Sequence, residues 1–350
     1  MIDYGLIGEK LGHSFSKTIH NQIADYRYDL LELTQNGLKE FMSKKEFKAV
    51  NVTIPYKQQV IPYLDEMSNA AKAIGAVNCV KNENGRLIGH NTDFDGLMAL
   101  IEYLGLDLKN KWVLILGTGG TSDTANAVCN ALGAERVIKV SRSGKDGSVT
   151  YEEALEGCKA CEIIINTTPV GMYPNNYSHS IDLTGFTNLE GVIDVVYNPL
   201  RTSFVSQALS LGIKAQGGLY MLVAQAVYAS EFFLGCKYDK SVIENIYNSI
   251  LKEKTKWKEN ITKKDYVAFF TTIIVGFITH MRVFVQDIPN HDGMTSIHFD
   301  QNMITSGRWF LRVACGISSD YTLPWLIGVL SVLYLAIAAV LLQRFFKVER

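Results

Sequence analysis

The chain has 350 residues, with 34 lysines and arginines against 35 aspartates and glutamates, so its formal net charge is -1. This length allows two or three domains with a large buried core, and the near-zero charge gives no reason to expect a nucleic-acid partner. The six cysteines are scattered, and the one C-x-x-C pair, Cys158 and Cys161, favours reduced thiols over a metal or redox site.

Residues 1–100 mix strands and helices. The opening residues predict a strand at 2–7 and a loop rather than a secretory signal, and a helix begins near Ser16. A second strand at 48–54 ends at Pro55 and is followed by Lys57, whose charge has no obvious structural purpose; the alternative is a surface cation. Helical spacing follows at 60–76, and 77–93 predict a hairpin that turns on "NENG".

From residue 111 the pattern becomes a regular alternation of strands and helices. "KWVLILGTGGTSDTANAVCNALGA" predicts a buried strand, a glycine loop and a helix, and further strands follow at 135–144, 161–172 and 191–199. Short apolar strands that alternate with helices indicate a parallel sheet covered by helices. Helices predicted at 217–235 and 240–254 then return to brace the first part of the chain.

The glycine loop predicts a dinucleotide site. Gly117, Gly119 and Gly120 follow a strand and open a helix, where bare backbone and free N–H groups favour a pyrophosphate. The spacing G-x-G-G leaves a tight turn without a ligand as the alternative. Arg142 follows the next strand, where an NAD site usually has an acid, so NADP is favoured unless Arg142 is only a solvated loop cation.

Small polar residues gather in the loops of the first unit, at Ser14, Ser16, Asn51, Thr53, Asn78, Asn91 and Asp93. Hydroxyls and amides of this kind bind polyols and carboxylates, although each one alone is more often a cap or turn residue. Eight motifs hold the order found in shikimate dehydrogenases: "GHSFSKTIHN", "NVTIPYK", "GAVNCV", "GHNTDFDG", "GTGGTS", "NTTPVGM", "VYNPLRT" and "GGLYMLVAQA". Over about residues 1–254 the chain therefore resembles that family.

The resemblance implies an α/β fold of two domains with a cleft between them. Residues 1–100 would form the substrate-binding domain, with the helices of 219–254 packing back on it, and 101–218 would form a Rossmann domain for NADP. The implied activity is the NADPH-dependent, reversible reduction of 3-dehydroshikimate to shikimate in cytoplasmic aromatic amino-acid biosynthesis, without a metal. Whether the chain forms a homodimer stays open.

The resemblance also implies a role for individual residues. Lys57 and Asp93 would be the catalytic acid–base pair. The substrate would be bound by Ser14, Ser16, Asn51, Thr53, Asn78, Tyr197 and Gln225. The cofactor would be bound by Gly117, Gly119, Gly120, Thr121, Ser141, Arg142, Thr167, Met172 and Gly218. Asp123 stands where the family often has a basic residue, which predicts weakened affinity for NADP through repulsion of the phosphate.

The last part of the chain, 255–350, predicts a membrane tail. Spans are expected at about 266–285 and about 324–342, because a bilayer needs about 20 apolar residues. The alternative for the first is a buried amphipathic helix. Basic residues before the first span and after the second predict that both ends face the cytoplasm, so the tail would attach the enzyme to the inner membrane.

The loop between these spans carries a second resemblance. "NHDG" and "SGRW" are similar to the first outer loop of the bacterial membrane glucosyltransferases that modify O-antigen, which implies a gene fusion or a truncated neighbouring reading frame. Asp287 and Asp292 would be the equivalent acids, and the alternative for Asp292 is a turn residue before Gly293.

Two other functions stay open at this stage. One is a quinate/shikimate dehydrogenase with relaxed cofactor use. The other is a non-catalytic cofactor-binding module that serves a membrane glycan system.

Overall fold

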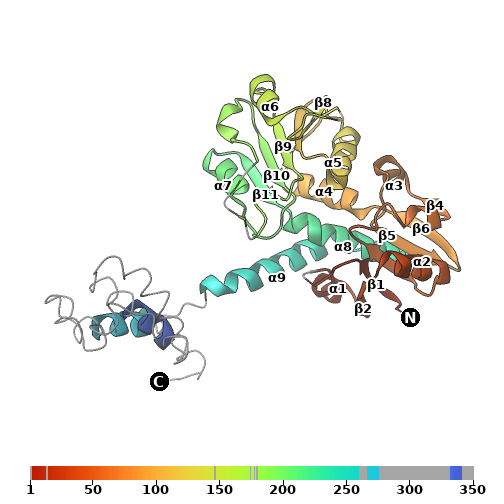
Figure 1. Ribbon diagram of the computed structural model, residues 1–350, viewed down its shortest axis with the longest axis horizontal. Helices are drawn as coiled ribbons and strands as arrows, with labels where there is room; N and C mark the ends of the chain where they lie inside the picture. Colours follow the sequence, from red (N-terminus) through yellow and green to blue (C-terminus); the bar gives the residue numbers. More distant parts are fainter. Residues whose placement is uncertain are drawn as a thin grey trace, which may run out of the picture. The chain divides into compact units, whose positions relative to one another are not determined.

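The computed structural model describes residues 2–12, 15–145, 147–173, 175–176, 178, 180–259, 266–275 and 332–340. The chain divides into two units, Met1–Leu251 and Lys252–Arg350. The first unit contains two β-sheets that are formed by separate stretches of the chain (Figure 1).

The N-terminal sheet has the strand order β2-β1-β3-β5-β6-β4. Its strands are β1 (Tyr4–Gly8), β2 (Tyr28–Glu32), β3 (Ala49–Val52), β4 (Glu66–Met67), β5 (Cys79–Glu83) and β6 (Arg86–His90). β1 pairs in parallel with β2 and β3, whereas β5 is antiparallel to β3 and β6. The hairpin predicted to turn on "NENG" is confirmed, because β5 and β6 are joined at Asn84 and Gly85.

Residues 60–76 differ from the prediction of helical structure. They form a short 3-10 helix (Ile61–Tyr63), then β4, and only then α3 (Asn69–Ile74). Ser68 caps α3, since its hydroxyl accepts a hydrogen bond from the backbone N–H of Ala71. The two-residue β4 exists because it pairs with β6, and a partner that follows later in the chain leaves no local signal.

Helices cover both faces of the N-terminal sheet. On one face, Leu38 and Met42 of α2 (Gln35–Lys44) and Ala71 of α3 share a core cluster with Ile7 and Val50. On the other face, Ala229 and Phe233 of α8 (Leu219–Leu234) pack with Leu6, Tyr28 and Cys79.

The second sheet has the order β11-β10-β9-β7-β8, and all of its strand pairs are parallel. Its strands are β7 (Trp112–Leu116), β8 (Arg136–Val140), β9 (Ile163–Asn166), β10 (Gly191–Asp194) and β11 (Lys214–Gly217). The predicted parallel sheet is therefore confirmed. β8 lies on one side of β7, and β9, β10 and β11 follow on the other side, so the strand order reverses between β7 and β9. Sheets of this kind bind ligands at the carboxyl ends of the strands at that point.

Four helices cover the two faces of this sheet. Ala154 of α6 (Tyr151–Gly157) and Phe204 of α7 (Ser203–Ser210) pack on the face of Leu114 and Ile164. The opposite face, with Val113 and Ile115, packs on α5 (Gly120–Ala131) and α4 (Thr92–Tyr103). A 3-10 helix at Leu183–Gly185 lies in the connection before β10.

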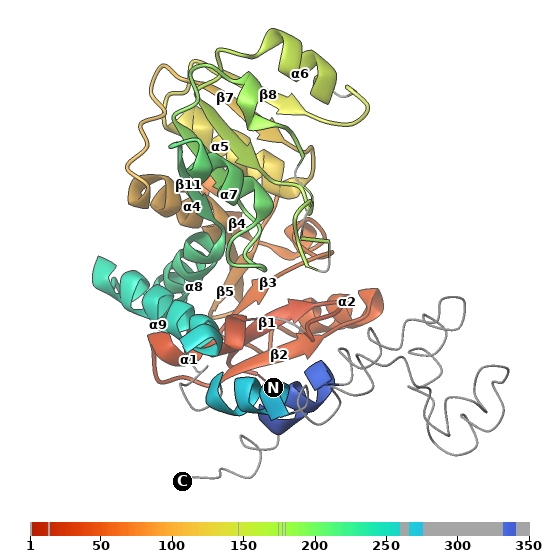
Figure 2. The same ribbon diagram turned by 90° about the vertical axis from the view of Figure 1, so that its left-hand side faces the viewer.

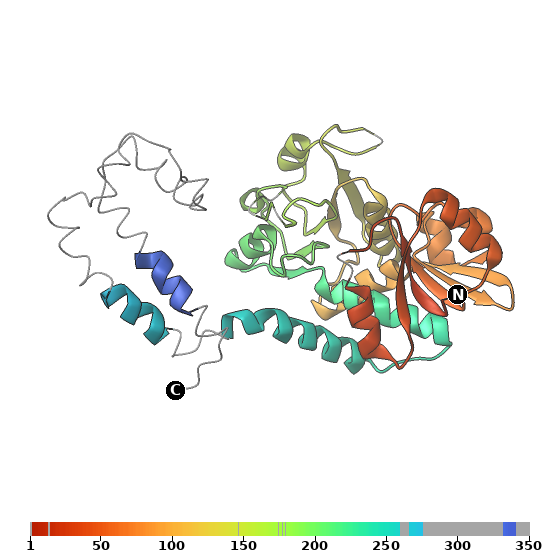
Figure 3. The same cartoon turned by 60° about the horizontal axis from the view of Figure 1, so that its bottom comes forward.

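Helices α4 and α8 lie between the two sheets (Figures 1 and 2). Val223 and Val227 of α8 belong to the core cluster of the second sheet, and Phe233, further along the same helix, belongs to the core of the first. Ile243 and Ile246 of α9 (Lys240–Glu259) share a cluster with Ile19 of α1 (Ser16–Ile23), so α9 lies beside α1 (Figure 3). Helix α8 therefore connects the core of the first sheet to that of the second.

In the second unit the structure describes two short helices, at 266–275 and 332–340. Within these described residues, neither helix has the length and apolar character needed to cross a membrane. Much of each predicted span, and also Asp287 and Asp292, lies outside the described residues, so the spans stay a prediction.

Candidate active site

The structure brings together the two residues predicted to be catalytic. Lys57 lies in the turn that follows β3, and its backbone carbonyl accepts a hydrogen bond of 2.8 Å from the N–H of Val77. Asp93 lies in the first turn of α4. The distance from Lys57 Nζ to Asp93 Oδ2 is 2.6 Å, and the side chains are 31% and 20% exposed. An ammonium group has three N–H donors, so Lys57 keeps donors for a ligand while it is bonded to Asp93.

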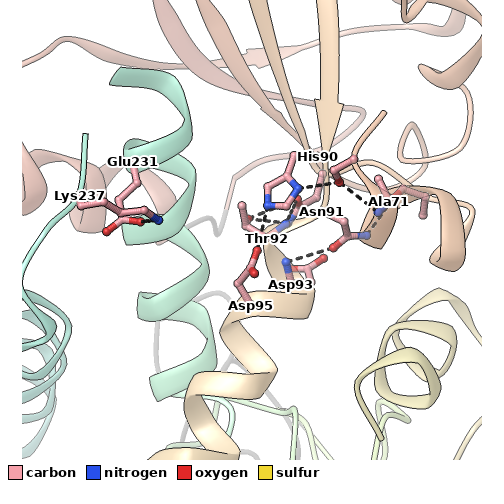
Figure 4. Close-up of polar contacts among 11 residues, drawn as sticks. Ala71, His90, Asn91, Thr92, Asp93, Asp95, Glu231 and Lys237 are labelled. Carbon is pink, nitrogen blue, oxygen red and sulfur yellow. Dashed lines mark hydrogen bonds and ion pairs between the residues drawn. The ribbon is translucent and has the colours of Figure 1, made fainter. Parts of the chain in front are cut away.

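The start of α4 is fixed by buried amides (Figure 4). Asn91 caps the helix, with its Oδ1 accepting from the N–H of Asp93 at 3.1 Å and its Nδ2 donating to the carbonyl of Ala76 at 2.9 Å. Asn78 Oδ1 accepts from the N–H of Thr92 at 2.7 Å, and Asn78 Nδ2 donates to Thr92 Oγ1 at 3.1 Å. These bonds connect the hairpin to the helix, and they hold Asp93 in position opposite Lys57.

The motif "NTDFDG" contains two acids, and the structure distinguishes them. Asp95 is bonded to His90, with 2.9 Å between Oδ2 and Nε2, and His90 Nδ1 lies 2.7 Å from Ser68 Oγ. Asp95 and His90 line a separate cavity of about 660 Å³, together with Glu231 and Lys237, which form an ion pair of 2.6 Å. In Figure 4 Asp95 lies toward α8 and Asp93 lies on the other side of the helix. Only Asp93 pairs with Lys57.

The other residues predicted to bind substrate differ in exposure. Asn51 is buried on β3, and its Oδ1 accepts a hydrogen bond of 2.7 Å from Tyr28 OH. Tyr197 is half-buried and meets Phe15 edge-on, with ring centroids 5.8 Å apart; burial raises the pKa of its phenol. The remaining described members are half-buried, namely Ser16, Thr53 and Gln225. Ser14 lies outside the described residues.

The glycine loop joins the end of β7 to the start of α5. Gly117 has a φ of +110°, which only glycine adopts readily, and a Cβ there would lie 2.8 Å from Thr167 Oγ1. Gly119 is the N-cap of α5, and a Cβ at Gly119 or Gly120 would meet nothing within 4 Å. The backbone at this helix N-terminus is therefore accessible to a phosphate.

Thr121 and Thr167 border this loop. Thr121 is half-buried in the first turn of α5. Thr167, just beyond β9, donates its hydroxyl to the carbonyl of Leu116 at 2.7 Å. Thr167 therefore ties the ends of β9 and β7 together at the point where the sheet reverses its winding.

Beyond β8 the chain forms a loop whose described residues include two exposed cations, Arg142 and Lys145. Ser141 Oγ accepts from the N–H of Gly144 at 3.0 Å and lies 2.7 Å from Ser148 Oγ, so this hydroxyl shapes the loop. Arg142 is exposed. Burial raises the pKa of Tyr151, and the nearby charge of Arg142 opposes that shift. Arg142 follows β8 by two residues and so lies near the carboxyl end of that strand.

Two further predicted cofactor residues have different environments. Met172 is 47% exposed. A Cβ on Gly218 would lie only 2.1 Å from the carbonyl oxygen of Val195, so glycine is needed there to bring the start of α8 against the end of β10.

Asp123, which is expected to repel a phosphate, has a counter-cation. Lys139 Nζ on β8 lies 2.7 Å from Asp123 Oδ1, and this ion pair offsets part of the negative charge. The predicted loss of NADP affinity has not been tested and stays a prediction.

Sequence reasoning named Asn91 among the polar loop residues but gave it no role, and it missed Thr92, Tyr28 and His20. All four are buried. Asn91 and Thr92 bond to Asp93 and Asn78, Tyr28 bonds to Asn51, and His20 stacks on Tyr28. Thr92 stands within the motif "GHNTDFDG", so its place next to Asp93 was the available signal. His20 and Tyr28 gave none, because their contacts are made across long stretches of chain.

The chain is similar to known proteins over most of its length. A family profile described as "Shikimate dehydrogenase substrate binding domain" matches residues 6–80. The shikimate dehydrogenase (NADP(+)) of Clostridium perfringens strain SM101 is 37% identical over 264 residues, which cover 71% of this chain and 97% of the relative.

Solved structures agree with these relatives. The crystal structure of shikimate dehydrogenase 1 from Peptoclostridium difficile matches with a TM-score of 0.64 and 35% identity, covering 71% of this chain and 98% of that one. A shikimate dehydrogenase crystallised in complex with NADP+ matches with a TM-score of 0.61 and 32% identity, covering 71% and 94% of the two chains. The chain belongs to the shikimate dehydrogenase family.

Proposed function

We propose that this protein reduces 3-dehydroshikimate to shikimate with NADPH, reversibly, and that Lys57 and Asp93 are its catalytic pair. The observation that carries the proposal is the contact of 2.6 Å between Lys57 Nζ and Asp93 Oδ2, which is made by a turn after β3 and by the first turn of α4. Relatives at 37% identity named as NADP(+)-dependent shikimate dehydrogenases support the reaction and the cofactor.

The chemistry of a ketone explains the need for this pair. NADPH, when it is bound, supplies the hydride to the carbonyl carbon. The carbonyl oxygen gains negative charge, and the Lys57 ammonium stabilises that charge and transfers a proton to it. Asp93 orients the ammonium, and solvent replaces the proton that Lys57 has transferred. In the reverse direction Lys57 accepts the proton from the hydroxyl.

The residues of this chain fit the cofactor. Gly119 and Gly120 leave open space at the N-terminus of α5, where the pyrophosphate would be held, and Thr121 and Thr167 border that loop. Arg142 would pair with the 2′-phosphate, with Ser141 shaping its loop. Met172 and Gly218 would lie on the nicotinamide side.

The substrate would be held by side chains of both sheets. Ser14 and Ser16 would bind the carboxylate, and Asn51, Thr53, Asn78 and Gln225 would bind the hydroxyls or neighbouring groups. Tyr197 would reach the substrate from the second sheet. We assign 1–100 with 219–254 to the substrate domain and 101–218 to the cofactor domain.

For the tail, the proposed role is attachment to the inner face of a membrane through spans at about 266–285 and about 324–342. The support is the sequence, since Pro324 to Leu342 carry no charged residue. The likeness to an O-antigen-modifying glucosyltransferase fragment and the homodimer stay predictions. Recovery of the full chain in the soluble fraction of lysed cells would contradict membrane attachment.

The test of the reaction is the Lys57→Ala variant, with shikimate and NADP+ followed by the absorbance of NADPH. Turnover should fall about 10²- to 10⁴-fold, the range expected for loss of a general acid, while the Kd for NADPH is unchanged. Lys44→Ala is the matched control, because Lys44 also lies 2.6 Å from a carboxylate, that of Glu40, but on the exposed face of α2. Turnover near that of the parent chain in Lys57→Ala would refute the assignment.

A further inference from the structure

His20, Tyr26 and Tyr28 form a cluster of stacked and hydrogen-bonded side chains next to Asn51. His20 and Tyr28 are 1% exposed, and their rings stack in parallel with centroids 3.9 Å apart. Tyr26 OH lies 2.5 Å from His20 Nδ1. On the other side of the stack, Tyr28 OH donates to Asn51 Oδ1 at 2.7 Å.

The environment of His20 determines its protonation. Burial lowers its pKa to about 3, and the hydrogen bond with Asn51 opposes that shift only in part. The ring is therefore neutral at physiological pH, with one N–H donor and one acceptor nitrogen. One of these two nitrogens, Nδ1, is bonded to Tyr26 OH.

Two bonds determine the orientation of the Asn51 amide. Oδ1 accepts from Tyr28 OH at 2.7 Å, and Nδ2 donates one hydrogen to the carbonyl of Asn78 at 3.3 Å. A reversed amide would direct its NH₂ group at the Tyr28 hydroxyl hydrogen and its oxygen at the Asn78 carbonyl. An amide nitrogen has two hydrogens, so in this orientation Asn51 keeps one N–H donor for a ligand.

We propose that His20, Tyr26 and Tyr28 are positioning residues, which lock Asn51 with its free N–H toward the substrate and so make the site select an acceptor oxygen there. This inference rests on the proposed role of Asn51 in binding substrate. It adds to the determinants of substrate affinity three residues that the sequence did not assign to the site.

The test is Tyr28→Phe, which removes one donor to Asn51 and keeps the ring stacked on His20. The KM for shikimate should rise about three- to tenfold, as expected for one hydrogen bond, while kcat and the KM for NADP+ stay within about twofold. In an Asn51→Ala background the same change should have no further effect on the KM for shikimate. An equal effect in both backgrounds, or an equal rise of both KM values, would overturn the proposal in favour of a general structural role.

Two further comparisons keep the test independent of folding. His20→Gln keeps a polar group that can bond to Tyr26 OH and should preserve the KM for shikimate, whereas His20→Leu should raise it. Tyr56→Phe is the matched control, since Tyr56 is equally buried but its hydroxyl donates to the carbonyl of Leu33. A KM for shikimate that is unchanged in Asn51→Ala would overturn both this inference and the role of Asn51, while the Lys57 assay would still report on the reaction itself.

Discussion

The substrate side and the cofactor side of the site use their polar groups differently. Around Lys57 and Asp93, the amides of Asn51, Asn78 and Asn91 are buried and bonded to other protein groups. On the cofactor side, Arg142 is exposed, and the backbone at Gly119 and Gly120 faces open space. On the substrate side, the polar groups are therefore already held in position by the fold. On the cofactor side, a positive charge and backbone N–H groups are accessible to the phosphates of a ligand.

This difference predicts that the free energy of unfolding depends on pH through a buried residue of the substrate side, His20. His20 is neutral when folded, with a pKa lowered by burial to about 3 from an ordinary value of 6.5. Below pH 6.5 the unfolded chain takes up a proton that the folded chain does not. Above pH 6.5 His20 therefore does not reduce the free energy of unfolding. Between pH 6.5 and about 3, protonation of His20 in the unfolded chain reduces it by about 1.4 kcal/mol per pH unit.

The comparison is made with His20→Gln, which has no titrating group. Urea titrations followed by circular dichroism between about pH 7 and about pH 4 should show a parent chain that loses about 3 kcal/mol more than the variant. Equal losses of unfolding free energy in the two proteins would show that His20 is accessible to protons in the folded state. The polar groups of the substrate side would then be less shielded from solvent than the structure indicates.

A smaller effect is expected on the exposed cofactor side. Arg142→Ala should raise the KM for NADPH about 10- to 150-fold, because a hydrogen bond to a charged group contributes about 1.5–3 kcal/mol. The KM for NADH, which has no 2′-phosphate, should not change, and neither should the KM for the keto acid. Steady-state rates with both cofactors provide the measurement.

Arg86→Ala is the control for that variant, because Arg86 is also an exposed arginine but pairs with Glu66 in the N-terminal sheet. If Arg142→Ala raised the KM for NADPH and the KM for NADH equally, Arg142 would not recognise the 2′-phosphate. The exposed loop would then serve general electrostatic attraction only.

The same contrast explains how much could be read from the sequence. The strand "WVLIL" and the glycines after it are a local signal, so β7, the loop and α5 could be predicted together. β2 was missed because "YDLLE" is a short edge strand with two acids, and β4 because two residues become a strand only through pairing with β6.

The candidate site divides in the same way. Lys57 and Asp93 could be chosen from motifs that stand in a known order, and the sequence could not reveal that Asp95 turns away to His90. The stack of His20 on Tyr28 and the bond from Tyr28 to Asn51 join residues from α1, β2 and β3. Such contacts depend on how the elements pack, and the spacing of residues along one element contains no information about them.

The central claim is that Lys57 and Asp93 act as one unit, and a double-mutant cycle tests it most directly. The kcat of Lys57→Ala, Asp93→Asn and the double variant would be measured with shikimate and NADP+. Each single change should lower kcat about 10²- to 10⁴-fold, and the double variant should be within about tenfold of the more damaged single variant. If the double variant instead lost the product of the two single effects, the residues would act independently, and the contact of 2.6 Å between them would not be the catalytic device.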